Sequence, residues 1–308
     1  MCEPTETLSV VIPFFNEGAS ARAVLEAVVE VVRGLGMTWE IVAVDDGSTD
    51  DTLAVLEAAR ADLPIRLVPL CRNFGKEAAL TAGMDASVGD AVVFLDGDLQ
   101  HPPGLIPAMV EKWREGFEVV HGVREERERE PLLYRTFALG FYRLFRGIAG
   151  QDLRGHSDFK LLDRQVVDAL RDCPERNRFF RGLVTWVGFR TCAIPLTIQP
   201  RAGGATKWSF AQLFVYSLRS ITSFSSRPLY WIAGMGLALL ALGIPMALLT
   251  FYRYFAGQAV DGFTTVILLL IILCGFIIFF IGIIAVYLAQ LFDEVKNRPT
   301  YIVRKPRG

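Results

Sequence analysis

Residues 40–50 read EIVAVDDGSTD, and residues 91–103 read AVVFLDGDLQHPP. In both stretches a short apolar run passes directly into acidic residues, DD at 45–46 in the first and DGD at 96–98 in the second. Short apolar runs bounded by turn residues are typical of buried strands. Open α/β sheets bind ligands at the carboxyl ends of their strands. The two stretches therefore predict one sheet with an acidic site at the edge where these strands end.

The flanking sequence predicts an alternation of strands and helices. Apolar runs at 8–15 and 65–70 predict two further strands, and apolar residues recur at helical spacing over 19–35, 52–61 and 76–86. Apolar strands joined by helical crossovers are typical of a parallel sheet that helices cover on both faces. We therefore predict an α/β, Rossmann-like domain with a mostly parallel sheet.

The acidic turns favour a divalent cation as ligand. Asp96 and Asp98 are separated by one glycine, so both carboxylates can point into one cleft. A hard cation such as Mg²⁺ takes oxygen ligands and completes its shell with water and substrate phosphates. Helix capping would explain Ser48 or Asp50 without any function. It does not explain acidic residues directly behind two different strands.

The composition excludes several classes of protein. The 308 residues include 32 Lys+Arg and 33 Asp+Glu, a net charge of −1, and 52% of them are hydrophobic. This excludes a disordered or fibrous chain, and the balanced charge argues against binding of nucleic acid. Residues 1–120 hold 8 basic and 20 acidic residues (net −12), which leaves 24 and 13 (net +11) for residues 121–308. The basic half suits anionic lipid or phosphate groups, with ordinary surface patterning as the alternative.

The excess of apolar residues lies near the C-terminus. No charged residue occurs in 228–252 or in 262–292, and each gap exceeds the roughly 20 apolar residues that cross a bilayer as a helix. We predict a transmembrane hairpin over 229–292, with spans at about 229–252 and 263–291. Two buried core helices are the alternative, which the lack of a polar stripe disfavours.

The basic residues predict the orientation of this hairpin. The connection at 253–262 carries a single arginine, whereas the tail at 293–308 carries five basic residues. By the positive-inside rule, the domain at 1–228 and the tail both face the cytoplasm, as in a multi-pass protein of the inner (plasma) membrane. The first apolar run lacks a basic region before it, so we expect no cleaved signal.

Two segments beside the hairpin suit a lipid surface. Residues 131–149 and 209–226 mix bulky apolar side chains with arginines. Amphipathic helices of this kind lie in the membrane interface, where basic side chains attract anionic headgroups. Ordinary helices that cover the sheet are the alternative. Glycines at 234, 236 and 243 allow close helix contacts, which is compatible with a homo-oligomer.

Several motifs together resemble those of family 2 glycosyltransferases with the GT-A fold. They are, in order, VVIPFFNE (10–17), VDDGSTD (44–50), NFGKEAALTAG (73–83), FLDGDLQHPP (94–103) and GVR (122–124). Farther along, HSDFKLL (156–162), FFRGLVTWVGF (179–189) and RAGGATKW (201–208) resemble the polyprenyl-phosphate sugar transferases of that family. These include dolichyl-phosphate mannose synthases and bacterial undecaprenyl-phosphate glucosyltransferases of the GtrB type, which also have two C-terminal spans. The resemblance covers essentially the whole chain.

This resemblance implies a reaction and its partners. A sugar passes with inversion from a nucleotide-sugar to a polyprenyl phosphate in the lipid bilayer, and a nucleoside diphosphate leaves. The resemblance implies Mg²⁺ or Mn²⁺ held by Asp96, Asp98 and Gln100. A donor UDP-sugar, with glucose as the sugar, is favoured over a GDP-sugar by analogy with the two-span glucosyltransferases. A mannose synthase that uses GDP-mannose is the alternative.

The same resemblance implies roles for the remaining positions. The nucleotide-sugar pocket comprises Pro13, Phe15, Glu17, Val44, Asp46, Asp96, Gly97 and Asp98. Arg124, Arg201 and Lys207 match phosphate-binding positions. Asp158 is the candidate, beside Asp96 and Asp98, for a catalytic carboxylate that orients the acceptor or stabilises the transition state. A phosphate monoester is already largely dianionic at neutral pH, which makes an obligatory base unnecessary; a cap on the following segment is the alternative for Asp158.

Other interpretations remain open at this point. We expect His101 to be a turn residue before two prolines, and Lys76 to be an ordinary lysine at the start of an exposed helix, although it could neutralise donor phosphate. A processive polysaccharide synthase would carry a QxxRW motif, which the sequence lacks. A non-catalytic membrane scaffold would not need the carboxylates, and a transporter would usually place an ionisable residue within a span.

Overall fold

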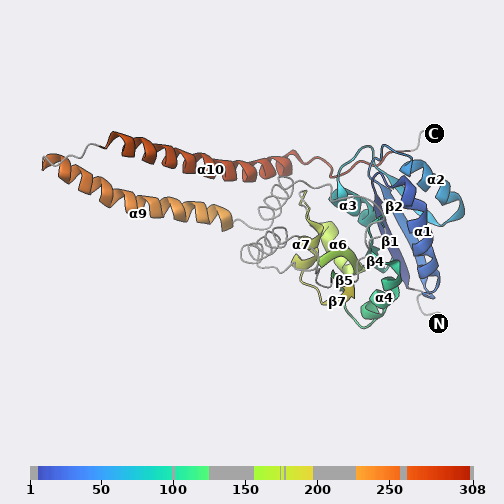
Figure 1. Cartoon of the computed structure of the whole chain (residues 1–308). Coiled ribbons are helices and arrows are strands. Elements are labelled where there is room, and N and C mark those ends of the chain that lie inside the picture. Colours follow the sequence, from blue (N-terminus) through green and yellow to red (C-terminus); the bar gives the residue numbers. More distant parts are fainter. Residues whose placement is uncertain are drawn as a thin grey trace. The chain divides into compact units, whose positions relative to one another are not determined.

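The computed structural model of the chain describes residues 6–98, 101–124, 156–173, 175–176, 178–196, 227–256 and 262–305. The chain divides into two compact units. The first contains the α/β domain together with residues 298–305, and the second contains two long helices near the C-terminus. Figure 1 labels most elements of the two units.

A seven-stranded sheet forms the centre of the first unit, with the strand order β3-β2-β1-β4-β6-β5-β7. The strands are β1 (Thr7–Phe14), β2 (Thr38–Asp45), β3 (Ile65–Pro69), β4 (Ala91–Phe94), β5 (Val119–Arg124), β6 (His156–Asp163) and β7 (Thr191–Leu196). The first four strands are parallel to one another, whereas β6 runs antiparallel to both β4 and β5. The predicted α/β class with a mostly parallel sheet is confirmed.

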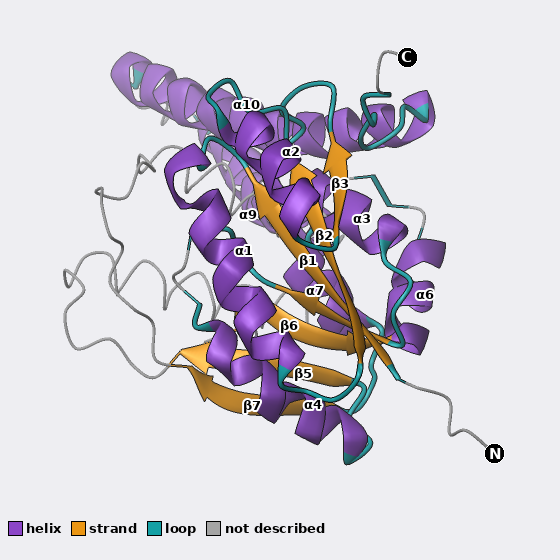
Figure 2. Cartoon of the chain, turned by 90° about the vertical axis from the view of Figure 1, so that its right-hand side faces the viewer, coloured by secondary structure: helices purple, strands orange, loops and turns teal. Residues whose placement is uncertain are grey.

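Helices cover both faces of this sheet, as Figure 2 shows. They are α1 (Gly18–Arg33), α2 (Thr52–Asp62), α3 (Lys76–Ala86), α4 (Ile106–Arg114), α6 (Arg164–Asp172) and α7 (Phe180–Trp186), with a 3₁₀ turn η1 (Pro103–Leu105) before α4. On one face, α1, α2 and α4 pack on a buried cluster that includes Val10, Ile12 and Ile41. On the other face, α3 packs so closely that a Cβ on Gly83 would lie 2.2 Å from Val11.

The parallel register places the loops that follow β1, β2, β3 and β4 at the same end of the sheet, where the carboxyl ends of these strands meet. Phe14 is opposite Asp45, and Asp45 is opposite Pro69, so β1, β2 and β3 end at one level. Gly47 has a positive φ of 64°, and a Cβ there would lie 2.2 Å from the backbone carbon of Arg72. The turn after β2 is therefore packed directly on the segment after β3. This edge carries the candidate site.

The second unit contains α9 (Arg227–Phe255) and α10 (Phe263–Lys296). Both are long and apolar enough to cross a membrane, over 229–246 in α9 and over 272–296 in α10. Their large apolar side chains, such as Leu237 and Phe279, are exposed. The two helices agree with the predicted spans. The amphipathic segments expected at 131–149 and 209–226 lie outside the described residues, and the homo-oligomer stays a prediction.

Candidate active site

The first acidic turn is held by backbone hydrogen bonds. Asp46 follows β2 directly, and its two carboxylate oxygens accept hydrogen bonds from the N–H groups of Phe74 (2.8 Å) and Gly75 (3.0 Å). Burial raises the pKa of Asp46, and the two N–H groups oppose that rise. The carboxylate predicted to bind the donor is thus nearly inaccessible to solvent and fixed by the segment that follows β3.

The loop after β1 is bound to the same turn. The N–H of Asn16 donates to Ser48 Oγ (3.0 Å), and the N–H of Thr49 donates to Asn16 Oδ1 (2.9 Å). Asn16 adopts a positive φ of 54°, a conformation that asparagine tolerates better than most residues. Asn16 lies in the motif PFFNE, but the sequence did not predict that Asn16 links two loops.

The other residues of the predicted nucleotide-sugar pocket also lie at the carboxyl ends of the strands. Pro13 is opposite Val44 in the register of β1 and β2, and Val44 is fully buried. Phe15 is 43% exposed, and the Glu17 N–H donates to Thr52 Oγ1 (2.9 Å). The structure therefore brings these four N-terminal positions of the predicted pocket together with Asp46.

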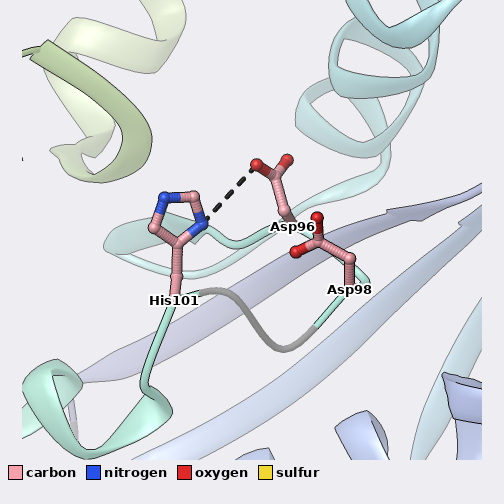
Figure 3. Close-up of side chains that lie close together, drawn as sticks. All are labelled: Asp96, Asp98 and His101. Atoms are coloured by element: carbon pink, nitrogen blue, oxygen red, sulfur yellow. Dashed lines mark ion pairs between the residues drawn. The ribbon is translucent and has the colours of Figure 1, made fainter. Parts of the chain in front are cut away.

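A second acidic cluster follows β4. Ligand atoms of Asp96, Asp98 and His101 all lie within 4.8 Å of one another. Figure 3 shows these three side chains close together. His101 is only 2% exposed, and its Nδ1 lies 3.5 Å from Asp96 Oδ2. We expected His101 to be a turn residue, but its ring lies in the acidic cluster. Gly97 is required here because a Cβ would lie 2.7 Å from the ring of Phe14.

Lys76 connects this cluster to the predicted catalytic carboxylate. Its Nζ lies 2.6 Å from Asp96 Oδ1 and 2.6 Å from Asp158 Oδ2. Burial by itself would lower the pKa of Lys76, but the charges of Asp158 and Asp96 outweigh it and raise the pKa above its ordinary value. Lys76 does start helix α3, as expected, but it is a bridge between two site carboxylates and not an ordinary surface lysine.

Arg181, at the start of α7, binds the same carboxylate from the other side. Its Nη2 donates to Asp158 Oδ2 (2.8 Å), and its Nε donates to Oδ1. Burial would raise the pKa of Asp158, yet the charges of Lys76 and Arg181 hold it well below its ordinary value. A carboxylate held in this way is a weak base. Sequence reasoning missed Arg181, although its place within FFRGL between apolar residues was a usable signal.

Two further ionisable groups adjoin Asp158, a buried lysine and a half-buried glutamate. Glu77 accepts a hydrogen bond from the N–H of Phe180 (2.9 Å), and burial followed by repulsion from Asp158 raises the pKa of Glu77 to about 7. Burial lowers the pKa of Lys160 to about 7, although the charge of Asp158 opposes that change. Glu77 and Lys160 therefore both have pKa values near neutrality and both interact with the charge of Asp158.

The family model described as "Glycosyl transferase family 2" matches residues 9–171. Those residues include both acidic clusters, Lys76 and Asp158. The chain belongs to this family. The glycosyltransferase is also similar along almost its whole length to several bacterial and phage relatives.

One relative, an uncharacterized glycosyltransferase of Synechocystis sp., is 37% identical over 97% of this chain and 95% of its own length. The "SfII prophage-derived bactoprenol glucosyl transferase" of Shigella flexneri is 35% identical over 97% of each chain. The "prophage bactoprenol glucosyl transferase homolog" of Escherichia coli K12 is 34% identical over 97% of this chain and 98% of its own. Among solved structures, a glucosyl-3-phosphoglycerate synthase of Mycobacterium tuberculosis is a distant likeness, with a TM-score of 0.48 at 23% identity, over 70% of this chain and 77% of that chain.

Some predicted site residues of the glycosyltransferase are not placed by the structure. Arg124 is the last residue of β5, and only its backbone is described. Gln100, Arg201 and Lys207 lie outside the described residues. The described part of the site thus has two acidic clusters, and a chain of ion pairs, Asp96–Lys76–Asp158–Arg181, joins the second cluster to the predicted catalytic carboxylate.

Proposed function

We propose that this glycosyltransferase transfers glucose from UDP-glucose to the phosphate of a polyprenyl phosphate, with inversion at the anomeric carbon. The observation that carries the proposal is the chain of ion pairs through Lys76, Asp158 and Arg181 beside the acidic cluster at Asp96 and Asp98. This arrangement places carboxylates that can bind a divalent cation next to the positively charged side chains of Lys76 and Arg181. The bactoprenol glucosyl transferases among the relatives support the choice of sugar and acceptor.

The acidic cluster fits a divalent cation. Asp96 and Asp98 offer carboxylate oxygens and His101 offers a ring nitrogen, all within 4.8 Å, and Gln100 is the amide ligand that the sequence predicts. Bound Mg²⁺ or Mn²⁺ would neutralise the charge that develops on the departing nucleoside diphosphate. The carboxylates would hold the cation at the carboxyl ends of the strands, close to the Asp46 turn that binds the nucleotide.

The basic side chains serve the two phosphate groups of the reaction. Lys76 and Arg181 supply positive charge where an anionic donor and a dianionic acceptor must approach each other. Asp158 keeps both side chains in place and is too weak a base to remove a proton at neutral pH. We assign it the role of orienting these cations, with Arg124, Arg201 and Lys207 as further phosphate-binding positions. The acceptor phosphate needs no proton removed before it attacks.

The membrane hairpin delivers the acceptor. Helices α9 and α10 are long enough to span a bilayer, and a polyprenyl chain resides in that bilayer. We assign the catalytic domain and the tail to the cytoplasmic side. The basic residues of the tail support this orientation, and so does the contact of residues 301–304 with β3, because it requires the tail and the domain to share one side.

The proposal is tested by release of nucleoside diphosphate from purified protein in detergent. UDP- and GDP-sugars are offered with Mg²⁺ or Mn²⁺, with and without undecaprenyl phosphate. We expect release only from UDP-glucose, only with the lipid phosphate, and only with the metal. Release from GDP-mannose alone would identify a mannose synthase. A lack of lipid-dependent release from every donor would contradict the proposal.

A further inference from the structure

The edge strand β3 is paired with the segment that follows α10. An edge strand presents unpaired backbone groups, and here the N–H of Cys71 donates to the Ile302 carbonyl (2.9 Å). The N–H of Arg304 donates to the carbonyl of Pro69 (2.7 Å). Leu70 and Val303 form an antiparallel bridge between these bonds. The tail therefore pairs with the β3 edge of the sheet through one isolated bridge and two flanking hydrogen bonds.

A side chain strengthens this attachment. The hydroxyl of Tyr301 donates to Asp85 Oδ2 (2.8 Å) on helix α3. Burial and this hydrogen bond both raise the pKa of Tyr301, so the hydroxyl stays protonated and remains a donor. Residues 301–304, the tail clip, thus contact both β3 and the helix that begins at Lys76.

The residues under the tail clip lead directly to the predicted donor pocket. Leu70 is fully buried, and its N–H donates to the carbonyl of Asp45 (2.8 Å). The backbone at Arg72 lies against Gly47. The next N–H groups, those of Phe74 and Gly75, hold the Asp46 carboxylate. A single segment of the chain, 70–75, therefore has the tail clip on one side and the first acidic turn on the other.

We propose that the tail clip is a positioning element of the donor site: by pairing with the end of β3, it holds segment 70–75 in the conformation that fixes Asp46. Because β3 ends at Pro69, segment 70–75 is held by its hydrogen bonds to Asp45 and Asp46 on one side and by the tail clip on the other. Since the tail clip follows α10 in the chain, the nucleotide-sugar pocket depends on a segment that lies beyond the membrane hairpin in the sequence. The proposal rests on the proposed function in one respect, the assignment of Asp46 to the nucleotide.

The test removes single interactions of the tail clip in the full chain. Arg304→Pro deletes the N–H that donates to Pro69, and Arg304→Ala is the matched control that keeps this N–H and loses only the side chain. Truncation after residue 299 removes the whole tail clip, and Tyr301→Phe removes only the hydroxyl. Hydrogen exchange of peptides covering 70–75, binding of UDP-glucose by calorimetry, and steady-state kinetics are measured for each variant in detergent.

We expect Arg304→Pro and the truncation to accelerate exchange at 70–75 and to weaken donor binding about five- to tenfold, the effect of losing one or two hydrogen bonds. The KM for the donor should rise while kcat and the KM for the lipid stay unchanged, whereas simple destabilisation would lower the active fraction and hence the apparent kcat. Tyr301→Phe should show a smaller change in the same direction, and Arg304→Ala none.

Unchanged donor affinity and unchanged exchange in the truncated protein would overturn the proposal. Equal effects of Arg304→Pro and Arg304→Ala would also overturn it, because the side chain and not the backbone pairing would then matter. If the unaltered protein binds no nucleotide-sugar, the proposed function fails, and the exchange of segment 70–75 alone decides whether the tail clip fixes it.

Discussion

The two acidic turns at the edge of the sheet are held by different means. The Asp46 carboxylate accepts two backbone N–H groups, and those donors belong to the scaffold. Asp96 and Asp158 are held by the side chains of Lys76 and Arg181. A side-chain cation can exchange a carboxylate for a substrate phosphate by rotating, but a backbone N–H cannot follow. The first turn is therefore fixed by the scaffold, whereas the side chains that hold the second can rotate. We expect the first turn to act as a fixed binding surface and the second to respond to substrate.

The largest effect is expected where the second turn would hold the cation. Asp98→Ala should lower turnover about a thousandfold, because charge on the departing diphosphate is no longer neutralised. Turnover is measured as lipid-dependent release of nucleoside diphosphate. Asp90→Ala is the control, since Asp90 accepts a hydrogen bond from Thr7 at the opposite edge of the sheet. Near-normal turnover of Asp98→Ala would place the reactive centre elsewhere.

Arg181→Ala tests whether the ion pairs of the second turn matter for the acceptor. We expect kcat/KM for the lipid phosphate to fall about a hundredfold, because Asp158 loses the planar donor that fixes both of its carboxylate oxygens and can then no longer orient Lys76. Arg181→Lys keeps the charge without the two-point contact, so it should recover only part of the loss. An equal loss of donor binding would show that Arg181 serves both substrates, and the contrast between the turns would weaken.

Asp46→Asn tests the fixed character of the first turn. The amide has one acceptor oxygen and places an NH₂ group against an N–H donor of segment 70–75, so this segment should shift. We expect the KM for the donor to rise about tenfold, roughly the cost of a lost hydrogen bond to a charged group, while kcat changes little. Steady-state kinetics with varied UDP-glucose measure this. A fall in kcat at unchanged KM would assign Asp46 to the chemical step.

Glu77→Gln gives the smallest expected effect and concerns stability. Glu77 has a pKa of about 7 in the folded protein against 4.5 ordinarily, so the folded state binds the proton more tightly and the free energy of unfolding falls as the pH rises between these values. Glutamine keeps an acceptor for the Phe180 N–H and does not titrate. The Tm difference between pH 5 and pH 8 should therefore be smaller in Glu77→Gln, by about 5 °C. Identical differences in both proteins would show that Glu77 stays ionised.

Much of the fold could be predicted from local sequence. The apolar runs at 8–15, 40–44 and 91–95 became strands β1, β2 and β4, because burial on both faces of a parallel sheet demands continuous apolar residues. The two long apolar segments near the C-terminus became α9 and α10. The strands β5, β6 and β7 were missed as elements, since their mixed sequences, such as HSDFKLLD at 156–163, lack a clear period.

The candidate site divides in the same way. Asp46, Asp96 and Asp98 could be predicted because they follow strands directly, and the carboxyl ends of parallel strands meet at one edge. Lys76 and Arg181 could not be assigned by position alone. They reach Asp158 across 82 and 23 positions of sequence, and His101 joins the acidic cluster only through the path of the loop after β4.

The sequence by itself determined the first four strands, the helices between them and the candidate membrane spans, since hydrophobic periodicity is a local property. It also determined which residues end the parallel strands. Tertiary structure alone decided which charges are paired and which edge strand is covered. Tyr301 reaches Asp85 across 216 positions, and such contacts depend on the route of the whole chain and leave no periodic trace near either residue.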